Sequence, residues 1–216
     1  MAAYPVLSHL PQGYAERGNW PLLIFLHGAG ERGSDLSLLK KWGPPALIDT
    51  WPDFPFVLLA PQCPLESWWT AETARLDAFL DEALAQRRVD PDRVYLAGFS
   101  MGGYGVWQWA LASPHRFAAL VTVAGGGFST PQMPIRINAG PQDMATIAHI
   151  PSWSFAGALD VFVPPAEVQA TIDALRAGGG DPRLTIYPDA DHESTAARAF
   201  ADPALYDWLL AQRRAG

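Results

Sequence analysis

The sequence predicts an α/β protein whose central sheet is mostly parallel and carries helices on both faces. Short apolar runs, the length of strands buried on both sides, alternate along the chain with helix-compatible segments. Several of these runs end abruptly in glycine-rich turns, as strands do at the edge of such a sheet. No repeat or linker interrupts the pattern, so we expect one domain over residues 1–216.

In the first half of the chain, the most apolar runs define the sheet. The expected strands are residues 4–10 at an edge, 20–26 and 56–60, and the expected helices are residues 36–42 and 70–88. Gly43-Pro44-Pro45 is expected to stop the first helix, and Asp90-Pro91-Asp92 reads as a turn. A loop over residues 61–69 carries Cys63 and two adjacent tryptophans.

The second half repeats the alternation. The expected strands are a run from residue 94 that ends in Gly98, then residues 117–124, 152–156 and 184–187, and the expected helices are residues 104–111, 164–177 and 203–212. Residues 128–151 are rich in proline, glycine and polar side chains, and we expect an irregular loop over the site there. Residues 191–193 are expected in a loop after the last strand.

Composition limits the possible partners and the location of the protein. Hydrophobic residues make up 49% of the chain and charged residues 17%, which is typical of a globular protein. The net charge of −7 and the lack of a basic block argue against nucleic acid or an anionic membrane as partner. The start of the chain lacks a signal-peptide pattern and no apolar run approaches 18 residues, so we expect a cytoplasmic protein. Cys63 is the single cysteine, which excludes an internal disulfide, and the oligomeric state stays open.

Ser100 stands at the centre of a G-x-S-x-G pattern between an apolar strand and a helix-compatible segment. This is the context of a nucleophile elbow, in which a sharp turn needs small residues two positions either side of the serine, here Gly98 and Gly102. The helix that follows favours a developing negative charge at its amino end. The alternative is a glycine-rich turn that happens to contain serine. We favour Ser100 as a nucleophile.

A nucleophilic serine needs a base, and the base needs an acid that orients it. With this type of elbow the chain order is serine, acid, histidine, and His192 is the histidine that follows a later strand. Asp160 ends the strand before it and is the expected acid. The alternatives are an exposed loop histidine and an aspartate at a helix start. Lesser candidates for the acid are Asp143, Asp189 and Asp191.

The tetrahedral intermediate of acyl transfer needs N–H donors aimed at its oxygen. We expect one from the backbone of Met101 and the other from Ala29, in the glycine-rich loop after an early strand. His27 is then expected to brace that loop.

The segment from Gly28 to Gly33 also matches the G-x-G-x-x-G pattern of dinucleotide sites. The next strand ends without the ribose-binding acid, and Asp49 and Asp53 lie in a proline-rich loop, so dinucleotide binding is disfavoured. We expect no metal site and no cofactor.

Four residues are candidates for contact with substrate. Trp68 and Trp69 lie in a loop at the carboxyl end of a strand, where ligands gather in such sheets, and ordinary packing is an equal alternative. Phe99 and Val161 flank the expected catalytic residues. The charges at Glu31, Arg32 and Glu193 are more simply explained as solvated loop side chains.

These motifs together resemble the α/β-hydrolase superfamily, and most closely its small bacterial esterases, a group of predicted peptidases, phospholipase/carboxylesterases and dienelactone-hydrolase relatives. The segments that carry the resemblance are residues 26–35 at the oxyanion loop, 89–105 around the elbow, 157–160 and 163–165 around the acid, and 187–192 around the base. The resemblance covers nearly the whole chain. It implies hydrolysis of small carboxylic esters, with feruloyl, acetyl and short acyl esters as substrate types.

Dienelactone hydrolases use cysteine at the elbow, whereas this chain has Ser100, which argues against that activity. The remaining alternatives are a serine peptidase or amidase of the same fold, acyl transfer to other nucleophiles, and a non-catalytic binding protein that retains a relic site.

Overall fold

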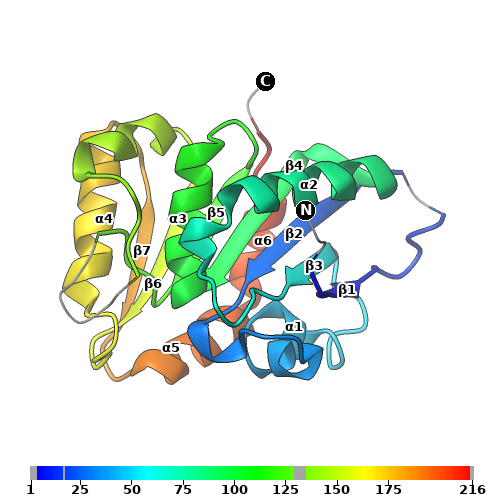
Figure 1. Ribbon diagram of the computed structural model, residues 1–216, viewed down its shortest axis with the longest axis horizontal. Coiled ribbons are helices and arrows are strands. Elements are labelled where there is room, and N and C mark those ends of the chain that lie inside the picture. Colours follow the sequence, from blue (N-terminus) through cyan, green and yellow to red (C-terminus); the bar gives the residue numbers. More distant parts are fainter. Residues whose placement is uncertain (1–3, 17, 129–134, 215–216) are drawn as a thin grey trace.

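The computed structural model describes residues 4–16, 18–128 and 135–214, and a seven-stranded sheet crosses its centre (Figure 1). The strands are β1 (Val6–His9), β2 (Trp20–Leu26), β3 (Val57–Pro61), β4 (Val89–Phe99), β5 (Ala119–Val123), β6 (Ser152–Gly157) and β7 (Arg183–Tyr187). They lie in the order β1-β3-β2-β4-β5-β6-β7. Only the β1–β3 pair is antiparallel, so the expectation of a mostly parallel sheet is confirmed.

Helices cover both faces of this sheet. The α-helices are α1 (Pro44–Leu47), α2 (Thr73–Gln86), α3 (Met101–Ala112), α4 (Pro165–Ala177), α5 (His192–Ala201) and α6 (Pro203–Leu210). Short 3₁₀ helices are η1 (Ala29–Glu31), η2 (Leu36–Lys41), η3 (Trp69–Ala71) and η4 (Pro141–Ile147). Helices α2, α3 and α4 share one apolar core with the sheet, and α5 and α6 share the other (Figure 1).

Strand β2 shows why its run is apolar throughout. Leu22, Ile24 and Leu26 belong to the core under α2 and α3, while Leu23 and Phe25 belong to the core on the opposite face. Because successive side chains of a strand point to opposite faces, a strand covered on both sides must be apolar at every position.

Three expectations for the helices and turns were wrong. Gly43-Pro44-Pro45 does more than stop a helix, because Pro44 is the first residue of α1, a position where the missing N–H costs nothing. Asp90-Pro91-Asp92 lies inside β4, at an irregularity where the pairing with β2 shifts register. The segment 191–193 is no loop, since α5 begins at His192.

The segment expected to be irregular, residues 128–151, contains η4 (Pro141–Ile147), with Met144 and Ile147 buried in the core. Part of the expectation of a loop over the site falls on residues 129–134, which lie outside the described residues.

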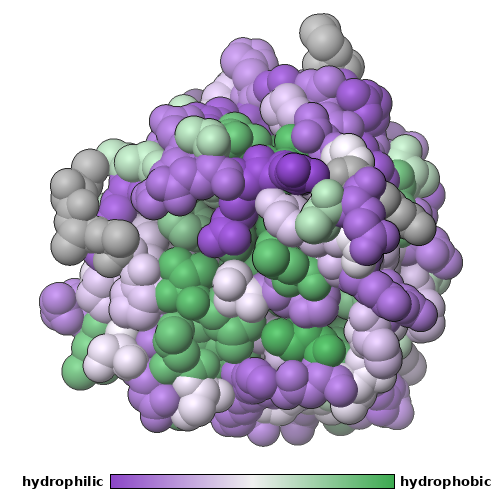
Figure 2. All heavy atoms as spheres, turned by 90° about the vertical axis from the view of Figure 1, so that its right-hand side faces the viewer, coloured by the Kyte–Doolittle hydropathy of each residue, from purple (hydrophilic) through white to green (hydrophobic). Residues whose placement is uncertain are grey.

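A groove of about 220 Å³ lies between α2 and the β1 edge of the sheet. Figure 2, which faces this side of the molecule, shows apolar side chains gathered in a hollow there. Its lining includes Tyr4, Val6 and Phe79 and none of the three expected catalytic residues. The helices over the described part of the chain include none with the length and apolar character needed to cross a bilayer.

Candidate active site

Ser100 occupies a strained turn between β4 and α3. Its φ of 54° and ψ of −116° lie in a region that residues with a Cβ rarely adopt. A Cβ on Gly98 would clash with the carbonyl of Gly102, and a Cβ on Gly102 would clash with the carbonyl of Leu26. Both glycines are therefore required by close backbone approach, which is the steric demand inferred from the sequence pattern.

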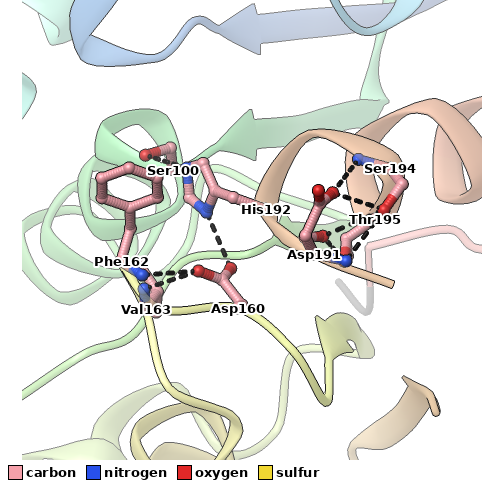
Figure 3. A network of polar contacts seen from close by, with 8 residues as sticks. All are labelled: Ser100, Asp160, Phe162, Val163, Asp191, His192, Ser194 and Thr195. Carbon is pink, nitrogen blue, oxygen red and sulfur yellow. Dashed lines mark hydrogen bonds and ion pairs between the residues drawn. The ribbon is translucent and has the colours of Figure 1, made fainter. Parts of the chain in front are cut away.

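The side chains of Ser100, His192 and Asp160 form a hydrogen-bonded chain (Figure 3). Nε2 of His192 lies 2.9 Å from Oγ of Ser100, and its Nδ1 lies 2.7 Å from Oδ2 of Asp160. Ser100 follows β4, Asp160 follows β6 and His192 follows β7. Because these strands are parallel, their carboxyl ends meet at one edge of the sheet, so residues far apart in sequence converge there.

The carboxylate of Asp160 is buried and held on both oxygens. Oδ1 accepts the N–H groups of Phe162 and Val163, each at 2.9 Å, while Oδ2 faces the imidazole of His192. Its side chain is fully buried and that of His192 is 13% exposed. The backbone bonds leave one oxygen free for His192, so the acid orients the imidazole with its Nδ1 proton toward Asp160 and Nε2 toward the serine.

His192 is held by the start of α5, which the sequence analysis did not anticipate. Asp191 is the N-cap of this helix, and its carboxylate accepts the N–H of Ser194 at 2.9 Å while the Ser194 hydroxyl accepts the N–H of Asp191 at 2.8 Å (Figure 3). The spacing of Asp191 and Ser194 was the available signal for this capping box. The hydrogen bonds from Ser194 lower the pKa of Asp191, whose carboxylate serves the helix start instead of the imidazole.

The two backbone N–H groups expected to bind an oxyanion both open helical turns. Met101 is the first residue of α3, and Ala29 is the first residue of η1. At this position an N–H has no carbonyl partner within its own helix. The oxyanion loop is braced by Arg32, which donates to the carbonyl of Ala29 at 3.0 Å and to that of Ser67 at 3.2 Å.

His27 is buried and ties the oxyanion loop to the end of β3. Its Nδ1–H donates to the carbonyl of Gly28 at 2.6 Å, and its Nε2 accepts the N–H of Cys63 at 3.0 Å. The indole N–H of Trp69 donates to the carbonyl of His27 at 3.0 Å. Burial lowers the pKa of His27 to about 4, so the ring is neutral and structural at neutral pH.

This pKa predicts an acid-sensitive stability. An unfolded His27 takes up a proton near its ordinary pKa of 6.5, whereas the folded ring resists protonation down to about 4. Unfolding is therefore favoured progressively as the pH falls from 6.5 to 4, by about 3 kcal/mol in the free energy of unfolding. We expect this contribution to vanish in His27→Gln, measured by urea unfolding at each pH. The exposed His115→Gln variant should keep the wild-type pH dependence, and an equally steep loss in His27→Gln would contradict the assignment.

The four candidate substrate contacts have different surroundings. Trp69 is fully buried in the core, so the packing alternative describes it. Trp68 is half-buried and stacks under the Arg32 guanidinium, 3.9 Å from the ring centre. Phe99 is buried with its ring centre 4.9 Å from that of His192. Val161 is exposed on the loop after Asp160.

Of the three charged residues expected to be solvated, Glu193 fits that expectation and Glu31 does not. Glu193 is exposed and pairs with Lys41 at 3.4 Å. Glu31 is 6% exposed within the oxyanion loop, and burial raises the pKa of its carboxyl. Only the packing of η1 against neighbouring loops decides this burial.

With this geometry established, the comparisons with known proteins can be interpreted. A family model described as the alpha/beta hydrolase fold matches residues 21–168. The chain therefore belongs to the α/β-hydrolase fold family.

Similar proteins are named for ester chemistry. A "Putative carboxymethylenebutenolidase" of Escherichia coli O157:H7 is 33% identical over 107 residues, which are 50% of this chain and 38% of that protein. A "Putative esterase NocK" of Nocardia uniformis subsp. tsuyamanensis is 30% identical over 216 residues, covering 84% of this chain and 56% of the relative. A crystal structure of a thermostable esterase has a TM-score of 0.80 at 26% identity, covering 97% of this chain and 59% of that one. This chain thus spans well under two thirds of the length of these relatives.

Proposed function

We propose that this protein is a serine carboxylic ester hydrolase that acts through Ser100, His192 and Asp160. The observation that carries the proposal is the continuous hydrogen-bonded chain from the Ser100 hydroxyl through the imidazole to a buried carboxylate. This arrangement converts a weak hydroxyl nucleophile into a reactive one. The esterase names of the relatives support the same reaction class.

The proposed reaction is acyl transfer in two steps. His192 takes the proton of Ser100 as its Oγ attacks the ester carbonyl, and the backbone N–H groups of Met101 and Ala29 stabilise the oxyanion. His192 then gives the proton to the departing alcohol, which leaves an acyl-enzyme. Water, deprotonated by His192, attacks the acyl-enzyme and releases the acid. Asp160 stabilises the imidazolium in both steps, and the chemistry requires no cofactor.

We further propose small-molecule esters with short or aromatic, feruloyl-type acyl groups as substrates, hydrolysed by this one domain in the cytoplasm. The small size of the chain and the aromatic rings around His192 support small substrates with apolar parts. Trp68 belongs to the proposal as a residue at the rim of the site, where its stacking on Arg32 leaves it half-buried.

Two measurements test this proposal. The first is hydrolysis of p-nitrophenyl esters from acetate to palmitate with methyl ferulate alongside, for which we expect activity that peaks at short chains or at ferulate. The second is reaction with a serine-directed fluorophosphonate, followed by mass spectrometry of the peptide that contains Ser100. Hydrolysis of aminoacyl anilides without hydrolysis of any ester would replace the esterase proposal by a peptidase, and lack of labelling would argue for a non-catalytic protein.

A further inference from the structure

An exposed apolar surface lies beside the imidazole of His192. Leu159, Val161 and Phe162 are 59%, 81% and 58% exposed, and all three lie in the short loop between β6 and α4. Single exposed apolar residues are common on protein surfaces and need no explanation. Three large ones within four residues, on either side of the expected catalytic acid, form a contiguous surface that solvent alone does not favour.

The loop that carries these side chains is fixed by hydrogen bonds. Asp160 accepts the N–H groups of Phe162 and Val163, and the N–H of Leu159 donates to the carbonyl of Ala190 at 3.0 Å. Val163 is fully buried and anchors the far end of the loop. The apolar surface is therefore held in place by the same bonds that position the carboxylate, so it is presented to the site as a preformed surface.

The chemistry of the reaction decides which part of an ester meets this surface. His192 must deliver its proton to the oxygen of the departing alcohol, so the first carbons of that alcohol lie next to the imidazole. The ring of Phe162 packs edge-on against the imidazole, with ring centres 5.3 Å apart (Figure 3). Phe99 also contacts the imidazole but is buried, so it offers little surface to a ligand.

The other neighbour of His192 is polar. Glu193, the next residue along α5, directs its carboxylate to Lys41 of η2. An apolar group that leaves past His192 therefore has the loop of Leu159, Val161 and Phe162 as its apolar contact, in continuity with the site.

We propose that Leu159, Val161 and Phe162 form the binding surface for the alcohol half of the ester, and that this surface selects alkyl or aryl alcohols over polyols such as sugars. The inference rests on the proposed function and adds to it the class of alcohol. Contact between this surface and the alcohol raises the rate of acylation, the step in which the alcohol departs, and has no part in hydrolysis of the acyl-enzyme.

Two ester series separate the alcohol from the acyl group. The first keeps the butyrate acyl group and varies the alcohol through ethyl, butyl, hexyl and phenyl, with glyceryl as the polyol. The second keeps the ethyl alcohol and varies the acyl group from acetate to hexanoate. The measured quantity is kcat/KM, because it contains acylation and excludes deacylation. We expect wild-type kcat/KM to rise by about 2- to 4-fold per methylene of the alcohol, within the range that burial of a methylene allows.

The test variants are Val161→Ser alone and Leu159→Ser with Val161→Ser, since both side chains are exposed and their loss leaves the core intact. We expect the double variant to reduce the hexyl-to-ethyl ratio by about 5- to 10-fold, with acyl preference and ethyl butyrate hydrolysis nearly unchanged. Leu10→Ser, which removes a 45% exposed leucine next to β1, is the matched control and should behave as wild type.

Each other outcome is decisive. An unchanged alcohol series in both variants, or a change confined to the acyl series, would overturn the inference while leaving the esterase proposal intact. An equal fall for every ester would also overturn it, because it would indicate a structural role for the loop. A wild-type protein that hydrolyses no ester in either series would instead refute the proposed function itself.

Discussion

Alanine at position 100 is expected to lower kcat for ester hydrolysis by about 10⁴- to 10⁶-fold with the fold unchanged. The substitution removes the Oγ that lies 2.9 Å from Nε2 of His192, and with it the bond that the acyl-enzyme requires. The backbone of the elbow does not depend on the hydroxyl, because the N–H of Ser100 donates to the carbonyl of Val123 and the carbonyl of Ser100 accepts from Gly103. Residual activity should come from the remaining oxyanion donors.

Initial rates on a p-nitrophenyl ester measure this loss, and circular dichroism reports whether the fold is retained. Ser8→Ala, at an exposed position of β1, is the matched control and should keep wild-type activity. Near-normal turnover by Ser100→Ala would defeat the assignment of Ser100 as nucleophile.

Asparagine at position 160 is expected to lower kcat by about 10⁴-fold, although it differs from aspartate by a single group. The N–H groups of Phe162 and Val163 both donate to Oδ1, so an asparagine must place its carbonyl oxygen there. Its NH₂ group then faces Nδ1 of His192, which can accept that bond only if its own proton moves to Nε2. An imidazole protonated at Nε2 cannot accept the proton of Ser100.

The tautomer gives this prediction a readout besides rate. Nitrogen-15 NMR of the histidine ring should place the His192 proton on Nδ1 in the wild type and on Nε2 in Asp160→Asn. Asp191→Asn is the matched control, because Asp191 caps α5 and asparagine is an equally good N-cap. Its activity should stay within a few-fold of wild type. A comparable loss in Asp191→Asn, or full activity in Asp160→Asn, would reverse the roles of the two acids.

The sheet and the elbow were predictable because their signals lie in contiguous residues. The apolar run Trp20–Leu26 coincides with β2, and the strand–turn–helix pattern around Ser100 appears where the glycines require it. Helix α5 was missed because its first residues are polar and follow a turn closely. Its capping residues Asp191 and Ser194 are a weaker signal than a long apolar period.

Contacts between distant segments were harder to predict from sequence. Glu31 and Trp69 stand in loops by pattern, and the packing of neighbouring segments buries both, so exposure could not be judged from their own positions. The same holds for Arg32, whose stacking on Trp68 depends on how two loops meet at the sheet edge.

The sequence by itself determined the α/β class, most strand positions and the choice of Ser100, Asp160 and His192 as candidates, because hydrophobic period, turn chemistry and chain order are properties of the chain. The tertiary structure alone decided that these side chains meet at hydrogen-bond distance, that Asp191 serves the helix, and that Phe162 lies against the imidazole. The physical reason is the parallel order of β4, β5, β6 and β7, which brings residues separated by up to 92 positions to one edge of the sheet.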